Sequence, residues 1–158
     1  MAQAAAPPGR PGRAGAMAFS LRHLHSALEL ERAVLGEESK VVCVRVGQDF
    51  HPDCMRMDEV LGGAAREVEA ACSVYAVDVR EVPECVAEFQ LAEPAALVFF
   101  FRGKALQLDL GAGGQRRFAQ PLEGQQAFVS LVEAVCRGAQ QGREVITAPR
   151  DYSLQFGY

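Results

Sequence analysis

Apolar and polar residues alternate along the chain in a pattern that predicts strands interleaved with helices. Residues 19–25 follow the two-residue period of a half-buried strand, whereas residues 41–46 form a β-branched run typical of a buried strand. Ser26 and Glu29 form a capping box before a short helix, and Pro52 begins a longer one. The strands expected are residues 19–25, 41–46, 73–79, 96–101 and 106–110; the helices expected are residues 26–35, 82–89 and 123–139, and a segment from residue 52 that is weakened or kinked at residues 62–63.

This order of elements, β-α-β-α-β-α-β-β-α, predicts an α/β fold in which helices cover both faces of a mixed sheet, the thioredoxin-like topology. At 158 residues the chain is one domain that needs neither a disulfide nor a metal to hold a core. Residues 1–16 are expected to be a disordered leader, residues 17–141 the domain, and residues 142–158 an extended tail. The longest apolar run, residues 95–101, is only strand-sized, so no membrane association is expected.

Charge and cysteine content narrow the classes of function. The net charge of −4 argues against a free-standing nucleic-acid binder. Residues 29–93 carry 15 acidic against 6 basic residues, and residues 94–158 carry 5 against 7. This asymmetry suits a protein held between different partners, although unevenly solvated faces are the alternative. The five cysteines are odd in number and widely spaced, which indicates buried thiols in a reducing compartment, with no metal or cofactor expected.

The position at which this fold would carry redox chemistry holds one thiol instead of two. A dithiol needs two cysteines separated by two residues at the start of the helix that follows the central strand. Here the first of these positions is His51, and only Cys54 remains. Asp53 beside Cys54 is expected to raise the pKa of the thiol. The sequence therefore predicts no oxidoreductase, with a monothiol redox or redox-sensing role for Cys54 as the alternative.

Several long motifs resemble those of one family. They are MAFSLRHLHS (17–26), GEESKVVCVRVGQDFHPDCMRMDEVL (36–61), VYAVDVREVPE (74–84), FFFRGKALQLDLGAG (99–113) and VEAVCRGAQQGREVITAPRDYS (132–153). Over residues 17–158 the sequence resembles the DIM-type thioredoxin-like proteins of the spliceosome, the small U5 snRNP and tri-snRNP subunit. The chain departs from that pattern at Ala95, where members often carry a second cysteine able to pair with the one that is Cys54 here, and at Cys136, Gln140 and Gln141.

The resemblance implies a nuclear, non-catalytic adaptor in pre-mRNA splicing. Its partners would be the large central scaffold protein of the spliceosome and other snRNP proteins, near the 5′ splice site. The resemblance also implies contact with snRNA or pre-mRNA and, as in some members, with a WW-domain protein.

Candidate contact residues lie at two places in the sequence. Phe50, His51 and Met55 surround the start of the long helix, where one of Met55 and Met57 is expected in the core and the other exposed, or both in the core. Basic and tail residues follow the last helix: Arg137, Arg143, Arg150, Asp151 and Tyr152. The arginines either complement the helix dipole or contact phosphates or acidic partners, and the Asp-Tyr pair either pins the tail or forms an arm that orders on a partner.

Two further residues carry structural expectations. Arg45 lies within an apolar strand, where burial would demand a carboxylate or carbonyl partner; a strand-end position near solvent is the simpler interpretation. Pro94, just before a strand, is the candidate for a cis peptide bond, which would shape the adjacent groove.

Overall fold

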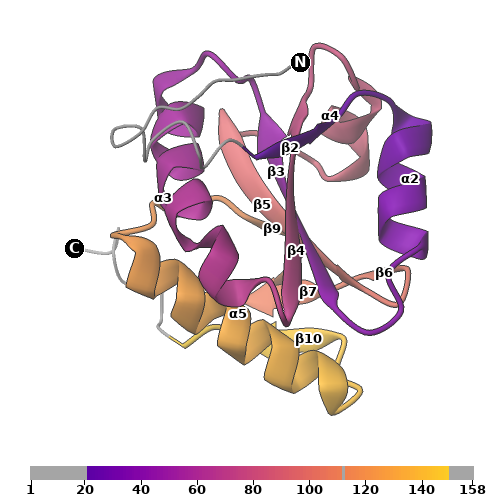
Figure 1. Ribbon diagram of the computed structural model, residues 1–158, viewed down its shortest axis with the longest axis vertical. Helices are drawn as coiled ribbons and strands as arrows, with labels where there is room; N and C mark the ends of the chain where they lie inside the picture. Colours follow the sequence, from indigo (N-terminus) through magenta and orange to yellow (C-terminus); the bar gives the residue numbers. More distant parts are fainter. Residues whose placement is uncertain (1–20, 112, 150–158) are drawn as a thin grey trace.

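The computed structural model describes residues 21–111 and 113–149, which are built around a mixed sheet (Figure 1). Its strands lie in the order β2-β4-β3-β5-β6, and β9 also pairs with β5. The β2–β4 and β4–β3 pairs are parallel, whereas β5 pairs antiparallel with β3, β6 and β9. The strands are β2 (Arg22–Leu24), β3 (Val41–Gly47), β4 (Cys72–Asp78), β5 (Ala95–Phe101), β6 (Lys104–Ala105) and β9 (Arg117–Phe118).

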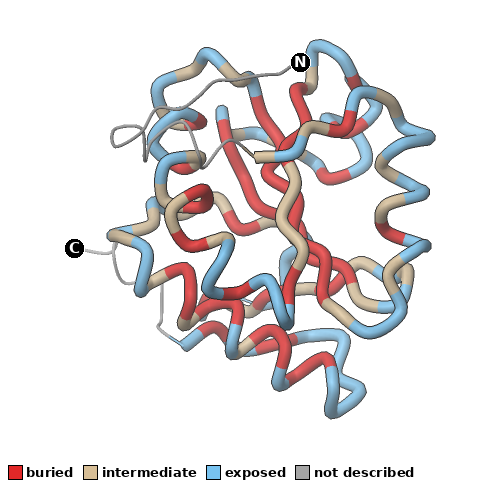
Figure 2. The backbone as a smooth tube through the Cα atoms, viewed as in Figure 1, coloured by how far each residue is buried: buried red, intermediate tan, exposed pale blue. Residues whose placement is uncertain are grey.

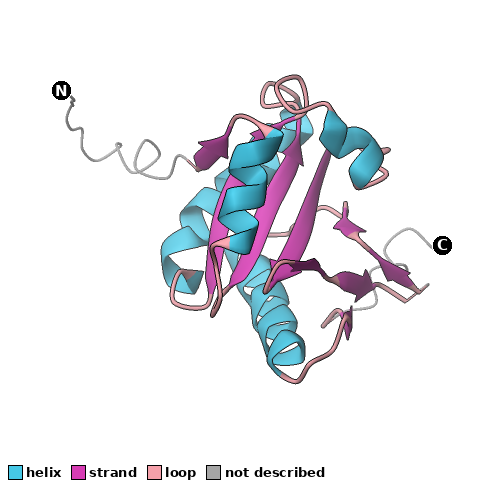
Figure 3. Ribbon diagram, turned by 90° about the vertical axis from the view of Figure 1, so that its right-hand side faces the viewer, coloured by secondary structure: helices cyan, strands magenta, loops and turns pink. Residues whose placement is uncertain are grey.

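Two helices cover each face of this sheet (Figures 1 and 3). Helices α3 (Pro52–Val68) and α5 (Gln125–Gln140) pack on one face, and α2 (Ala27–Leu35) and α4 (Glu84–Glu88) pack on the other. All of β3 is buried, because its alternate side chains enter two separate apolar clusters: Cys43 faces α3 and α5, and Val44 faces α2 and α4. Figure 2 shows the resulting band of buried residues through the centre.

A smaller sheet joins the segment after α5 to the domain. Its strands are β7 (Gln107–Asp109), β8 (Gly114–Gln115) and β10 (Val145–Thr147), in the order β10-β7-β8. The parallel pairing of β10 with β7 places Ile146 opposite Leu108, and both side chains are buried. The first part of the predicted tail is therefore extended and hydrogen-bonded to the domain. The predicted leader and the remainder of the tail lie outside the described residues.

Local signals in the sequence account for most of the helix boundaries. Ser26 Oγ accepts the N–H of Glu29 at 3.1 Å, and the Glu29 carboxylate accepts the N–H of His25 at 2.8 Å, so the capping box is confirmed. Helix α3 continues through Gly62 and Gly63 without a break, so the two glycines do not interrupt it. A Cβ at Gly63 would collide with Gln125 of α5, so the glycine permits close packing of the two helices.

Candidate functional site at the start of helix α3

His51 is the N-cap of α3. Its Nδ1 accepts a hydrogen bond from the backbone N–H of Asp53 at 3.1 Å, which satisfies one of the N–H groups that a helix start leaves free. Pro52 follows in the first turn, where its fixed φ suits the helix. The side chain of His51 is half-buried. The position that a dithiol would need for its exposed thiol therefore holds an imidazole that is engaged in the helix cap.

Cys54 lies in the first turn of α3, and it is fully buried. Its Sγ donates a hydrogen bond to the carbonyl oxygen of Pro94 at 3.3 Å. Burial raises the pKa of the thiol to about 11, although the nearby Arg45 guanidinium opposes this shift. A Cβ at Gly47 would collide with both Cys54 Sγ and the Pro94 carbonyl, so only glycine permits this close approach. The thiol is protonated at neutral pH and shielded from solvent.

The other four cysteines are also buried, and all five are free thiols. Cys43, Cys72 and Cys136 belong to the apolar cluster beneath α3 and α5, whereas Cys85 lies on the opposite face of the sheet. Burial, followed by a hydrogen bond with Cys72, holds the pKa of Cys43 well above its usual range. Burial likewise raises the pKa of Cys85 and of Cys136 to about 11. The expectation of buried thiols is confirmed, and none of them has the solvent exposure that thiol exchange requires.

Arg45 is fully buried beneath the start of α3, so the expected position near solvent is wrong. Its Nε and Nη2 donate to the two carboxylate oxygens of Asp58 at 2.7 and 2.8 Å. Nη2 also donates to Asp49 at 2.5 Å, and Nη1 donates to the carbonyl oxygen of Val77 at 3.1 Å. His23 Nε2 lies 3.0 Å from the second oxygen of Asp49. This network ties β2, β3 and β4 to α3 and to the loop before it.

Two large apolar side chains are exposed at this helix start. Phe50 is 76% exposed and Met55 is 58% exposed, whereas Met57 is buried, which confirms that one methionine packs in the core and the other does not. The guanidinium of Arg80 lies 5.0 Å from the centroid of the Phe50 ring. Arg80 also hydrogen-bonds the buried Asp78 and thereby lowers the pKa of that carboxyl to about 2. We define Phe50, His51 and Met55 as the α3-start surface; their role as contacts stays a prediction.

The structure does not bring the basic candidate residues to this surface. Arg137 lies in the last turn of α5, at the other end of the molecule from the start of α3 (Figure 1). Arg143 follows shortly after, and both side chains are exposed with no carboxylate partner among residues 21–111 and 113–149. Arg150, Asp151 and Tyr152 lie outside the described residues. The two arginines therefore form a separate candidate surface.

A groove of about 440 Å³ opens beside the start of α3. Its lining includes Asp53 and Arg56 from the helix, Pro94 and Ala95 before β5, and Gln120 from the segment before α5. The Oε1 atom of Gln120 is buried and has no hydrogen-bond partner in the described part of the chain. The groove thus combines charged side chains of the helix with small apolar ones, a lining that suits the binding of a peptide segment. The expected cis bond at Pro94 is wrong, because the described residues contain no cis peptide bond.

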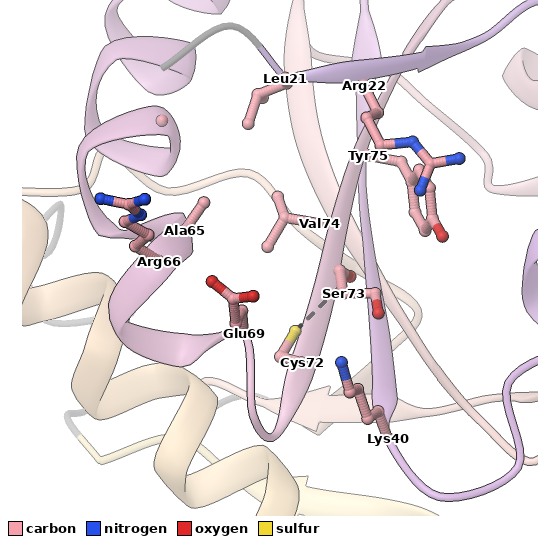
Figure 4. A pocket seen from close by; sticks show the side chains of 11 residues that line it. Leu21, Arg22, Lys40, Ala65, Arg66, Glu69, Cys72, Ser73, Val74 and Tyr75 are labelled. Carbon is pink, nitrogen blue, oxygen red and sulfur yellow. Dashed lines mark hydrogen bonds between the residues drawn. The ribbon is translucent and has the colours of Figure 1, made fainter. Parts of the chain in front are cut away.

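A second groove, of about 460 Å³, lies between α3 and β4 (Figure 4). Ala65 and Val74 contribute apolar surface, and the Glu69 side chain projects from the helix end toward the strand. The Cys72 thiol at its base donates to the carbonyl oxygen of Ser73 at 3.7 Å and is itself buried. The buried Cys72 thiol is therefore not accessible from this groove, although Lys40, Ser73 and Tyr75 also line it.

Sequence reasoning missed several residues that shape the site. Asp49, Asp58, Arg80 and Gln120 were not expected as site residues, because most of their contacts form only once the strands, helices and loops have packed. The one available signal was the cation inside the apolar strand, since a buried arginine requires carboxylate partners.

No metal centre or membrane span emerges from the described residues. Among residues 21–111 and 113–149, no three His, Cys, Asp or Glu side chains are grouped so that they could hold a metal ion. His23 and His25 stack with their ring centroids 6.1 Å apart and pair with Asp49 and Glu81, respectively. None of the described helices is long and apolar enough to cross a bilayer.

Comparison with known proteins assigns the chain to a family. The family model described as Mitosis protein DIM1 matches residues 20–152. The chain belongs to the DIM1 family. It is 34% identical over 142 residues to Mitosis protein dim1 of Schizosaccharomyces pombe, a match that covers 90% of this chain and 100% of that protein. It is 32% identical over 135 residues to Spliceosomal protein DIB1 of Eremothecium gossypii, covering 85% of this chain and 94% of that protein.

Solved structures identify the fold of this DIM1 family member. Fasciola hepatica thioredoxin superimposes with a TM-score of 0.57 at 18% identity, and the match covers 72% of this chain and 97% of that one. The predicted thioredoxin-like α/β fold is confirmed. At this level of identity the likeness concerns the fold alone, so function has to be argued from the site.

Proposed function

We propose that this chain is a structural component of the spliceosome that acts in pre-mRNA splicing and catalyses no reaction. Relatives that match most of its length carry the name Spliceosomal protein DIB1, including those of Eremothecium gossypii and Saccharomyces cerevisiae. The family match over residues 20–152 supports the transfer of this role, because it spans every described helix and strand.

The state of Cys54 is the observation that carries the non-catalytic part of the proposal. Thiol exchange requires an accessible thiolate and, in a dithiol mechanism, a second sulfur that resolves the mixed disulfide. Cys54 is fully buried and hydrogen-bonded to Pro94, and burial raises its pKa to about 11. His51 occupies the exposed position, and Ala95 stands after the proline. A thioredoxin-like protein with these residues would act by binding partners through its surface.

The exposed surfaces suggest how such an adaptor would meet its partners. The α3-start surface offers Phe50 and Met55 as exposed apolar side chains, which suits a protein segment from the large central scaffold or another snRNP protein. Arg137 and Arg143 have no ion-pair partner among residues 21–111 and 113–149 and suit snRNA or pre-mRNA phosphates near the 5′ splice site, with Arg150 as a third candidate. A WW-domain partner and a nuclear location belong to the same proposal.

Affinity purification of the tagged full chain from nuclear extract tests the proposal. We expect spliceosomal proteins and snRNAs in the eluate, and equal recovery with a Cys54→Ser variant, because the thiol is not required for contact. Recovery of neither class would contradict the splicing role.

A reductase assay on the same proteins tests the absence of catalysis. The purified chain is expected to reduce insulin with dithiol donors no faster than the donors alone. Turnover by the unmodified chain that Cys54→Ser abolishes would establish the monothiol alternative and overturn the non-catalytic part.

A further inference from the structure

A third groove lies on the face of the sheet opposite to α3. It measures about 690 Å³, within the range of ligand-binding clefts, and runs between α2 and α4 down to β5 and β6. Its floor is apolar: Val34, Val82, Phe89 and Phe100 line it and are buried. The Phe89 and Phe100 rings pack edge to face with their centroids 5.9 Å apart, which makes the floor rigid.

The rim of this α2–α4 groove carries apolar side chains that no described element covers. Leu28 and Leu35 line the groove from α2 and are 52% and 60% exposed. Their seven-residue separation places them on one side of the helix, about 10 Å apart along its axis. The exposed leucines extend the apolar surface from the buried aromatic floor to the rim of the groove. The resulting apolar strip is long enough to contact roughly two turns of a partner helix.

Acidic side chains flank this apolar strip. Glu31 lies between the two leucines on α2, and Glu84 and Glu88 line the groove from α4. All three are exposed, and none has a hydrogen-bond or ion-pair partner within the described ranges. Arg116 is the one cation among the described lining residues. Three unpaired carboxylates around an apolar strip select against acidic partners and favour basic ones.

From this combination we propose that the α2–α4 groove docks a basic amphipathic helix of a protein partner. Its apolar stripe would lie on Phe89 and Phe100 between Leu28 and Leu35, in the way an amphipathic helix enters a hydrophobic groove. Lysines or arginines beside the stripe would face Glu31, Glu84 and Glu88. This surface is independent of the α3-start surface, because the sheet separates the two.

Fluorescence anisotropy of a synthetic peptide against the purified full chain tests the proposal. The probe is a helix of about 14 residues with leucines on one face and lysines beside them, and a second peptide carries glutamates in place of the lysines. We expect the lysine peptide to bind about tenfold or more tightly than the glutamate peptide, and we expect added salt to weaken its binding. No binding of the lysine peptide, or equal binding of both, would overturn the proposal.

Matched variants locate the site. The double variant Glu84→Lys with Glu88→Lys should weaken binding of the lysine peptide about tenfold. Glu59→Lys with Glu67→Lys, the same charge change at exposed positions of α3, should leave it nearly unchanged. Leu28→Ala with Leu35→Ala should also weaken binding, whereas Val86→Ala, exposed on α4 outside the groove, should not. Each variant is first checked for an unchanged melting temperature.

Two results would exclude a basic helix of a protein partner as the ligand of the α2–α4 groove. Equal effects of the two charge-reversal pairs would show that the peptide responds to net charge rather than to the groove. Sedimentation showing self-association of the chain that Leu28→Ala with Leu35→Ala abolishes would assign the groove to a second copy instead.

Discussion

Arg45 is a cation in the interior of the sheet, and carboxylates from two segments hold it there. Burial opposes its charge, yet the hydrogen bonds and charge of Asp58, together with Asp49, keep the pKa of the guanidinium above its usual value. The contact with Asp58 is bidentate, a geometry that matches the planar fork of arginine and that lysine cannot reproduce. Arg45 thereby links β3 to α3 close to Cys54 and the helix cap, in addition to the apolar contacts that α3 makes with the sheet.

Arg45→Met is expected to lower the free energy of unfolding by about 3 kcal/mol. The substitution leaves two carboxylates without their buried partner, and breaking such a pair is strongly destabilising. The matched control is Arg56→Met, which removes the exposed ion pair between Arg56 and Asp53 and should change stability by less than about 1 kcal/mol. Urea denaturation of the three proteins measures the difference. Equal midpoints for both variants would show that the Arg45 network contributes no more than a surface pair.

The redox position and the Arg45 network differ in how far they could be predicted from the sequence. The loss of the redox pair could be predicted, because His51 and Cys54 stand at the spacing that a dithiol needs, and the family resemblance marks Ala95 as the place of a second cysteine in other members. The partners of Arg45 could not, because Asp49 and Asp58 reach it only once β3 and α3 have packed. Residue identities alone show that dithiol exchange is absent, whereas the Arg45 network could be recognised only from the folded structure.

At the scale of elements, hydrophobic periodicity predicts the strands and helices that are long enough to bury a row of their own side chains. Strands β3, β4 and β5 and helices α2, α3 and α5 lie within a few residues of their expected positions. Strands β8 and β9 were missed, because each has two residues and is ordered by its neighbour, β7 or β5. Likewise, β10 lies within the tail that was predicted to be extended. Its pairing with β7 could not be predicted, because no local sequence pattern indicates it.

Besides its pairing with β7, β10 is attached to the domain through the buried side chain of Ile146. A Cβ at Gly138 of α5 would lie 2.7 Å from Ile146 Cγ1, so strand and helix are in close contact at this point. Ile146→Ala should lower the free energy of unfolding by about 3 kcal/mol, because it empties a buried site. Val145→Ala, on the exposed side of the same strand, should cost less than about 0.5 kcal/mol. Amide hydrogen exchange should show faster exchange across β7 and β10 in the first variant alone. Unchanged protection there would mean that β10 is held by its backbone pairing instead.

At the scale of the whole molecule, the exposed features lie on separated surfaces. The α3-start surface carries aromatic and thioether groups, and the α2–α4 groove carries carboxylates around an apolar strip. The end of α5 carries arginines that have no ion-pair partner in the described part of the chain. The acidic excess of residues 29–93 thus contributes carboxylates to the α2–α4 groove, and the basic excess of residues 94–158 contributes arginines to the end of α5. A protein with several unlike faces can contact several partners at once, which is what an adaptor inside a large assembly requires.

If these faces act separately, variants should remove different partners from the same purification. Phe50→Ala with Met55→Ala is expected to reduce recovery of spliceosomal proteins from nuclear extract, because truncating exposed aromatic and thioether anchors removes contact area without touching the core. Arg143→Ala should reduce recovery of snRNA more than that of protein, since it deletes an unpaired cation. Melting temperatures should stay unchanged in both cases.

Arg32→Ala, an exposed arginine on α2, is the charge-matched control and should leave recovery intact. A lower melting temperature for Arg143→Ala would show that this residue stabilises the end of α5 instead of contacting RNA. Identical losses of protein and snRNA in both test variants would show that the faces serve one continuous interface. Distinct losses would support an adaptor whose contacts are divided among separate surfaces.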